Sequence, residues 1–369
     1  MKNFGKRVLA LTACFAMVIS LISQNMISVY AENTDDLSRE YEIYPIPHHI
    51  EYSAGGFIIR PDVNVIYESK IDNATKNHLK DVVNIKKKNY EVTDGIAEKK
   101  TNVLVGVYGS GEFVDQYVQE HYEINASVFQ KYGGHYVISA NDEIIILGAD
   151  TDAAFYGITS LEHIFHQMEG STIRYFTIKD YADTNIRGFI EGYYGNPWSN
   201  EDRMSLMEFG GDFKMTSYIF APKNDPYHTS KWRELYPDSE IKEIKKMVEV
   251  GNTSKCRFVW TAHPFMGGFN SSDVDGEIAS LLNKFEQLYS VGVRQFGVLG
   301  DDVGSLNRDI VIQVMTAVSN WAKEKGDVYD SVFCPAGYNH AWQGDYSELN
   351  DYDKNFPDNI QIFWTGEAV

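Results

Sequence analysis

The chain contains little cysteine and little positive charge for its length. Its 369 residues include three cysteines, and 33 Lys and Arg residues stand against 52 Asp and Glu residues, which gives a formal net charge of -19. There is no CxxC pair and no zinc-type spacing, so a disulfide scaffold and a structural zinc site are not expected. Binding to a nucleic-acid backbone requires clustered basic residues. We therefore expect no nucleic-acid partner.

Long apolar runs are also scarce, and the one that stands out follows three basic residues at the N-terminus. It extends from Val8 to about Ile22, and small residues at 29–31 suit a signal peptidase. This pattern predicts a secretory signal peptide over residues 1–31. The alternative is an uncleaved anchor, but the run is shorter than the ~20 residues that span a membrane. We expect an extracellular protein that has no membrane association after cleavage.

Only two cysteines follow this leader, Cys256 and Cys334, and both lie in apolar runs. They are expected to be buried free thiols rather than a disulfide. The common nucleotide, nucleophile and zinc-protease motifs (a P-loop, GxGxxG, GxSxG and HExxH) do not occur, and nothing in the sequence requires a metal or another cofactor. The 43% hydrophobic content is typical of a globular chain with large cores.

Residues 32–180 show mixed strand and helix patterns that predict an α+β domain. The hairpin expected at 135–149 turns at Asn141-Asp142. No catalytic group of residues stands out here. The other expected elements are two strands within 50–67, a helix at 73–88, a strand at 101–109, a helix at 151–167 and a closing strand at 171–181.

Residues 181–369 alternate short apolar strands with amphipathic helices, which predicts a parallel sheet covered by helices. With this many repeats, a (β/α)8 TIM-type barrel is favoured over an open sheet, although about six of eight strands are present. The expected strands are 185–192, 215–223, 256–264, 293–302, 331–338 and 360–366, and the expected helices are 200–213, 238–250, 274–290 and 306–324.

In such barrels the working residues follow the carboxyl ends of the strands. The adjacent Asp301 and Asp302 at one such end are the sharpest feature. Two close carboxylates do not both ionise freely, so the pKa of one rises and that group can act as a general acid. The alternative is that they cap the N-terminus of the next helix.

Other strand ends carry polar and aromatic residues. Lys223 can donate to substrate hydroxyls or pair with Asp225. His263 is either a catalytic base or, as we favour, a hydrogen-bonded structural histidine. Glycines 188, 192 and 195 allow a ligand to approach the backbone or form a tight turn. The aromatic residues at these ends, which can be ligand platforms or core, are Tyr193, Tyr194, Trp198, Tyr338 and Trp342.

Five segments together resemble glycoside hydrolase family 84, the bacterial hyaluronidase-like β-N-acetylglucosaminidases also called O-GlcNAcases. The resemblance covers roughly residues 40–369, and the first half is similar to the domain that precedes the barrel in this family and in bacterial β-hexosaminidases. The segments are RGFIEGYYGNPWS (187–199), YIFAPKNDPYH (218–228), YPDSE (236–240), FGVLGDDVG (296–304) and CPAGYNHAW (334–342).

The resemblance implies a retaining reaction in which the substrate's own 2-acetamido oxygen attacks the anomeric carbon and forms an oxazoline. By the same resemblance, Asp301 orients and polarises the acetamido N–H, and Asp302 protonates the leaving oxygen and then deprotonates water. The resemblance further implies that Lys223 and the backbone of Gly188 bind sugar hydroxyls, and that Tyr338 hydrogen-bonds to the acetamido group or the oxazoline.

The chain also departs from the family pattern. Pro-Ala-Gly precedes Tyr338 where the family usually has Pro-Thr-Glu, and WTGEAV (364–369) stands where the family has a WTGPGVV-like strand end. Further family sugar-binding residues belong to later loops that the 369 residues do not include. The favoured function is a secreted enzyme that removes β-linked N-acetylglucosamine from glycoproteins or glycosaminoglycans. The alternatives are a truncated, non-catalytic remnant that at most binds such glycans, and a two-carboxylate glycosidase that pairs Glu191 with Asp302.

Overall fold

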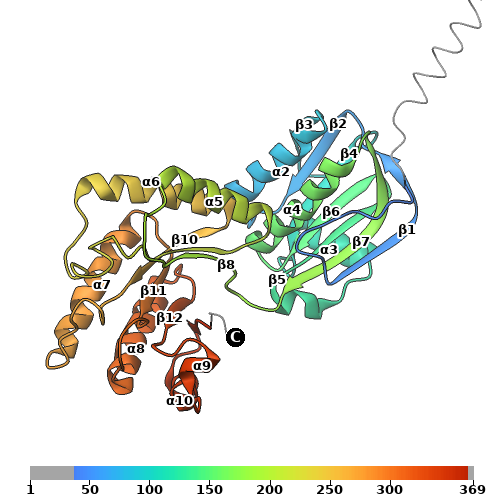
Figure 1. Cartoon of the computed structure of the whole chain (residues 1–369). Helices are drawn as coiled ribbons and strands as arrows, with labels where there is room; N and C mark the ends of the chain where they lie inside the picture. The colour runs from blue at the N-terminus through green and yellow to red at the C-terminus, as the bar shows by residue number, and fades with distance from the viewer. Residues whose placement is uncertain (1–36, 365–369) are drawn as a thin grey trace, which may run out of the picture. The chain divides into compact units, whose positions relative to one another are not determined.

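The computed structural model describes residues 37–364, which form two compact units that divide between Ala182 and Asp183 (Figure 1). The expected signal peptide lies outside the described residues, as does most of WTGEAV. Among the described residues, no helix has both the length and the apolar character needed to cross a membrane. Each unit is described by itself below.

The first unit is a seven-stranded mixed sheet in the order β1-β7-β5-β6-β4-β2-β3, with helices on both faces. Helices α2 and α4 pack over one face and share its core, and α3 and η1 cover the other. The elements are β1 (His49–Ile58), β2 (Asp62–Tyr67), α2 (Asn73–Ile85), β3 (Asn89–Val92), β4 (Thr101–Val107), α3 (Phe113–His121), η1 (Ala126–Gln130), β5 (Tyr132–Ala140), β6 (Glu143–Gly148), α4 (Thr151–Gln167) and β7 (Thr172–Ala182).

The predicted hairpin is confirmed, because β5 and β6 pair antiparallel across a two-residue turn. Asn141 and Asp142 both have positive φ, 51° and 62°. A two-residue turn with both φ values positive matches the right-handed twist of its strands, and Asn and Asp tolerate it best after glycine. Helix α4 begins and ends as expected, and Asp150 caps it by accepting from the N–H of Ala153. The sequence analysis missed β3 and α3.

The second unit is a six-stranded parallel sheet in the order β13-β12-β11-β10-β9-β8, so each strand lies beside its neighbour in the chain. The sheet curls as part of a barrel, which confirms the predicted fold class. The elements are β8 (Gly188–Glu191), α5 (Asn200–Asp212), β9 (Ser217–Phe220), α6 (Asp238–Ser254), β10 (Arg257–Ala262), α7 (Val274–Ser290), β11 (Gln295–Leu299), α8 (Arg308–Lys325), β12 (Ser331–Cys334), α9 (His340–Gln343), α10 (Ser347–Asn355) and β13 (Ile360–Ile362).

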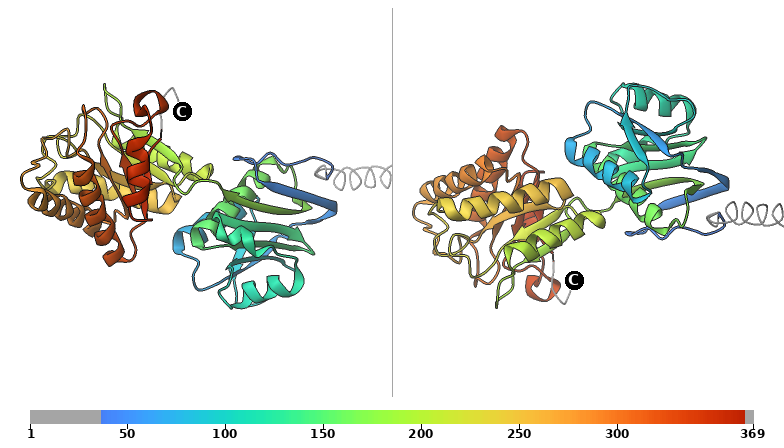
Figure 2. Two further views of the ribbon diagram at one scale, coloured as in Figure 1. Left: turned by 90° about the horizontal axis from the view of Figure 1, so that it is seen from below. Right: turned by 90° about the horizontal axis from the view of Figure 1, so that it is seen from above.

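Alternate strand residues face the helices or the inner side of this sheet. On the helix side, Trp260 and Phe296 pack with residues of α5–α8 in one large core. The ribbons of these helices lie along that face of the sheet (Figures 1 and 2). On the inner side, Ile219, Val259 and Val332 form a small apolar layer. Strands that are apolar on both faces are what a buried parallel sheet requires. Cys256 and Cys334 are buried and free, as expected.

The parallel register brings the carboxyl ends of β8–β12 to one edge of the sheet. The loops that leave this edge carry Tyr194, Lys223, His263, the Asp301-Asp302 pair and Tyr338. These side chains come from five separate segments of sequence. The fold therefore builds a polar site at the edge where barrel enzymes carry their working residues.

Candidate active site

Lys223 and the two aspartates form the centre of the site. Lys223 follows β9, and its Nζ donates to Oδ2 of Asp301 at 2.9 Å and lies 3.6 Å from Oδ2 of Asp302. The lysine side chain is 5% exposed, so bulk water screens these contacts little. A single buried ammonium thus holds both carboxylates toward the same point.

The alternative pairing of Lys223 with Asp225 is wrong. Asp225 turns away and accepts from the hydroxyl of Tyr236 at 2.5 Å and from the N–H of Tyr227 at 2.8 Å. Burial raises the pKa of Asp225, and these hydrogen bonds oppose that rise. Asp225 shapes the loop after β9, and its contacts leave Lys223 to the aspartates.

Asp301 is kept ionised by its surroundings. Burial alone raises the pKa of this carboxyl, but His263 and Lys223 outweigh burial and hold the pKa well below its usual range. Hydrogen bonds and positive charge favour the carboxylate form. Oδ2 accepts from Lys223, and Oδ1 accepts no well-aligned hydrogen bond. Asp301 therefore remains charged, with Oδ1 buried and Oδ2 bonded to Lys223.

His263 is a buried, hydrogen-bonded histidine, which confirms the reading favoured from the sequence. Its Nδ1 accepts from the N–H of Met266 at 3.2 Å. That bond leaves the ring proton on Nε2, which donates to the carbonyl oxygen of Asp301 at 2.7 Å and lies 3.2 Å from Oδ1. With contacts at both ring nitrogens, the imidazole is held in one orientation and acts as a fixed support behind Asp301.

Asp302 occupies a different environment from its neighbour. Its backbone has a φ of 58°, in the left-handed region that non-glycine residues rarely enter. One carboxylate oxygen accepts from the hydroxyl of Tyr194 at 3.0 Å. The helix-cap alternative is wrong for this pair, because Asn307 caps α8. A strained conformation at a strand end is typical of functional residues.

Two tyrosines flank the aspartates. The hydrogen bond to Asp302 raises the pKa of Tyr194. From the sequence, Tyr194 was expected only as one of several aromatic residues at the strand ends. Burial, and then the charges of Asp302 and Asp301, raise the pKa of Tyr338. Tyr338 packs against a small apolar cluster of Ala221, Leu299 and Cys334. The aspartate charges therefore contribute to the raised pKa of both tyrosine hydroxyls.

The structure does not bring Gly188 to this site. Gly188 begins β8 and pairs with Ser217 at the start of β9, so it lies at the amino ends of the strands. A Cβ here would come within 1.7 Å of the carbonyl oxygen of Ser217. The absence of a side chain serves close strand packing. Gly192, just past the carboxyl end of β8, is the glycine that lies at the edge with the aspartates.

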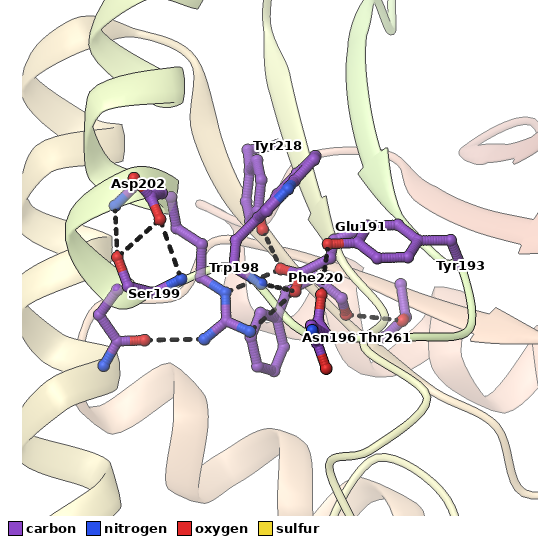
Figure 3. A network of polar contacts seen from close by, with 11 residues as sticks. Glu191, Tyr193, Asn196, Trp198, Ser199, Asp202, Tyr218, Phe220 and Thr261 are labelled. Atoms are coloured by element: carbon purple, nitrogen blue, oxygen red, sulfur yellow. Dashed lines mark hydrogen bonds and ion pairs between the residues drawn. The ribbon is translucent and has the colours of Figure 1, made fainter.

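Glu191 is committed to a structural network (Figure 3). Arg203 donates to both of its oxygens, from Nε at 2.7 Å and from Nη2 at 2.8 Å. The hydroxyl of Tyr218 and the N–H of Trp198 donate to the same carboxylate. Glu191 is fully buried, and Arg203 belongs to α5. This arrangement argues against the two-carboxylate alternative, because neither oxygen of Glu191 is free to attack a sugar.

Residues 37–364 contain no group of three His, Cys, Asp or Glu side chains arranged to hold a metal ion. What the described site offers is an ionised carboxylate, a second carboxylate beside it, a buried lysine and two tyrosine hydroxyls. Such a set can move protons and stabilise developing positive charge on a substrate.

The curled parallel sheet, with paired carboxylates at its carboxyl edge, defines this unit as the catalytic-domain type of a (β/α)-barrel enzyme. Residues 187–369 match the family model for β-N-acetylglucosaminidase, and residues 40–181 match that for domain 2 of glycosyl hydrolase family 20. The chain belongs to glycoside hydrolase family 84.

Solved structures and curated proteins agree with this assignment. The structure of CpGH84D superposes with a TM-score of 0.84 at 46% identity, over 89% of this chain and 56% of that one. The structure of CpGH84B superposes with a TM-score of 0.72 at 27% identity, over the same shares of the two chains. The proteins called Protein O-GlcNAcase of Rattus norvegicus and Mus musculus are each 25% identical over 196 residues, which is 49% of this chain and 21% of theirs. The chain thus spans about half of these solved chains and about a fifth of the curated relatives.

Proposed function

We propose that this protein hydrolyses β-linked N-acetylglucosamine from glycoproteins or glycosaminoglycans by a retaining, substrate-assisted reaction. The observation that carries the proposal is the unequal environment of two adjacent carboxylates. Asp301 is held ionised by Lys223 and His263, whereas Asp302 contacts Tyr194 and lies farther from the ammonium. Substrate-assisted hydrolysis needs one charged carboxylate and one that carries a proton.

In the proposed reaction the carbonyl oxygen of the 2-acetamido group attacks the anomeric carbon, and the bond to the leaving oxygen breaks. Asp301 accepts the acetamido N–H and stabilises the positive charge of the oxazolinium. The ionised state of Asp301, held by Lys223 and His263, supports this role. Asp302 donates its proton to the leaving oxygen, and later takes a proton from the water that opens the oxazoline. No protein nucleophile is required, and this agrees with the complete engagement of Glu191.

The remaining residues orient the sugar in this proposal. Lys223 keeps Asp301 charged and also donates to a sugar hydroxyl; its contact with Asp301 supports the first role. Tyr338 donates to the acetamido oxygen or the oxazoline, and the effect of the two aspartate charges on its hydroxyl supports this role. The backbone of Gly192, rather than that of Gly188, lies at the correct strand end to contact the sugar.

We also infer that the protein is secreted, because the first 31 residues have the pattern of a signal peptide. N-terminal sequencing of protein recovered from the culture medium tests this inference. A mature chain that begins near Glu32 is expected. Recovery of intact Met1 in the cell fraction alone would contradict secretion.

The central test is the pH dependence of hydrolysis of an aryl β-N-acetylglucosaminide by the full-length protein and by Asp302→Asn. We expect the variant to lose about 10²–10⁴-fold in kcat/KM, the usual contribution of general acid–base catalysis. It should also lose the alkaline limb of the profile, because that limb reports deprotonation of the acid. Asp353→Asn, an exposed carboxylate on α10, is the matched control and should behave as wild type.

Two companion measurements test the rest of the proposal. The corresponding aryl glucoside, which lacks the acetamido group, should not be cleaved, because the nucleophile is then absent. NMR of the first-formed product should show the β-anomer. An Asp302→Asn profile with an unchanged alkaline limb, or ready cleavage of the glucoside, would overturn the mechanism.

A further inference from the structure

A cavity of about 450 Å³ lies beside Asp302, outside the group that contains Lys223, Asp301 and Tyr338. We call it the outer cavity. Its size falls within the usual range of small-molecule sites. Among the described residues its wall includes Asp302, Ser305, Leu306, Arg308, Trp342 and Glu348.

Asp302 is the boundary between the outer cavity and the residues that hold the N-acetylglucosamine ring in the proposed function. Its Oδ2 lies 3.6 Å from Lys223, on the side of Asp301. The same residue lines the outer cavity. A general acid must come within hydrogen-bond distance of the oxygen that joins the sugar to its leaving group. The leaving group therefore extends from Asp302 on the side away from Asp301, into the outer cavity.

Trp342 gives the outer cavity an aromatic wall. The residue is 58% exposed, an unusual position for so large an apolar group. Its ring is fixed from one side by Tyr338, with ring centroids 4.8 Å apart and planes inclined by 60°. The backbone N–H of Trp342 donates to Oδ1 of Asn339 at 3.0 Å. An exposed indole held in this way presents a flat face on which the C–H face of a sugar can stack.

Besides Asp302, the wall has two charged residues, Arg308 and Glu348, and both already have hydrogen-bond partners in the protein, which favours a neutral ligand. Arg308 donates to Oδ2 of Asp351 at 2.5 Å and to the hydroxyl of Ser347 at 3.0 Å. Glu348 accepts from the hydroxyl of Tyr352 at 2.9 Å. Neither charge stands alone to attract an ion, but both retain hydrogen-bonding capacity for hydroxyl groups. Small residues at 304, 336 and 337 leave room beside the indole.

We propose that the outer cavity binds the first sugar of the leaving group, with Trp342 as its stacking surface, so that glycan-linked rather than peptide-linked N-acetylglucosamine is the preferred substrate. This inference rests on the proposed function, because it takes Asp302 as the general acid. It adds the class of leaving group, which is a neutral hexose.

The test compares three substrates of the full-length protein. The first is β-N-acetylglucosaminyl fluoride, whose leaving group is a single atom and does not reach the outer cavity. The second is a disaccharide with N-acetylglucosamine β-linked to galactose, and the third is a serine glycopeptide. For Trp342→Ala we expect kcat/KM to fall about tenfold on the disaccharide, as the loss of one aromatic contact of about 1.4 kcal/mol implies. The fluoride and the glycopeptide should change by less than about twofold.

Two variants control for misfolding. Trp342→Phe keeps an aromatic face and should recover part of the disaccharide activity. Phe209→Ala removes an exposed aromatic side chain on α5, which does not line the outer cavity, and should match wild type on all substrates. Equal losses by Trp342→Ala on fluoride and disaccharide, or a loss on the glycopeptide instead, would overturn the inference alone. No cleavage of the fluoride by wild type would overturn the proposed function, and the inference with it.

Discussion

Asp301 and Asp302 are neighbours in the chain but differ in every contact that matters for proton transfer. Lys223 and His263 contact Asp301 from 78 and 38 residues away. Tyr194 contacts Asp302 from 108 residues away. The sequence predicts both carboxylates at one strand end, because an apolar strand precedes them. It cannot distinguish them without the neighbouring strands, since the difference comes entirely from long-range contacts.

Glycine positions show a second limit of sequence reasoning at this scale. Gly188 and Gly192 lie at opposite ends of one four-residue strand. An error of a few residues in the strand boundary therefore moves the expected ligand contact from one edge of the sheet to the other. The pairing of Gly188 with Ser217 shows that Gly188 lies at the amino end of β8. This register is a property of the paired strands and not of one segment of sequence.

His263 is a positioning residue in the proposed reaction, and its removal should change the pH profile. In His263→Ala, Asp301 loses one of the contacts that hold its pKa low. The pKa of Asp301 should therefore rise toward its ordinary value. The acid limb of kcat/KM should then move to higher pH, because Asp301 must be ionised to bind the acetamido N–H. We expect kcat at neutral pH to fall about tenfold or more as Asp301 loses its fixed orientation.

The conservative variant His263→Gln separates positioning from packing. A glutamine can still donate toward the carbonyl oxygen of Asp301, so part of the activity and of the acid limb should return. Thermal unfolding of both variants gives the stability change independently. Reduced stability with an acid limb identical to wild type would show that His263 has a packing role only.

At the scale of helices and strands, the apolar pattern was sufficient for the elements that build the cores. All six strands of the second unit and four of its helices occur where the sequence predicts them. The elements that were missed are polar. Strand β3 is an edge strand with exposed Asn89 and Glu91, and α10 has Tyr352 as its one buried residue. A pattern of alternating burial is absent where an element covers little of the core.

The Glu191 network joins β8 and β9 to α5 and should support the fold rather than the chemistry. Glu191→Gln leaves the buried Arg203 without a charged partner. Removing one member of a buried ion pair costs about 3–5 kcal/mol of unfolding free energy. Urea unfolding measures this change. Glu201→Gln, an exposed carboxylate on the same helix, should change stability by less than about 0.5 kcal/mol.

Activity measurements on Glu191→Gln add the decisive comparison. Per folded molecule, kcat for the aryl N-acetylglucosaminide should stay within about threefold of wild type, because the reacting sugar does not contact this carboxylate. Tyr218→Phe, which removes one hydroxyl donor from the network, should cost about 1 kcal/mol. A collapse of kcat in a fully folded Glu191→Gln would restore the two-carboxylate mechanism.

For the molecule as a whole, the acidic balance bears on which glycans would reach the proposed active site. The formal net charge of -19 produces a negative field that extends about 10 Å at 0.1 M salt and about 30 Å at 0.01 M. The site itself adds two carboxylates against the single ammonium of Lys223. A polyanionic glycosaminoglycan is therefore repelled on approach, whereas a neutral glycan is not.

This repulsion predicts that salt changes the kcat/KM of a polyanionic substrate and leaves that of a neutral substrate unchanged. For an oligosaccharide with alternating glucuronate and terminal N-acetylglucosamine, kcat/KM should rise several-fold between about 0.01 M and 0.15 M ionic strength, because screening removes the barrier to encounter. A neutral oligosaccharide of equal length should show a flat response and serves as the control. If the glucuronate substrate were instead cleaved faster at low salt, a local cationic surface would have to outweigh the net charge, and glycosaminoglycans would become the favoured substrates.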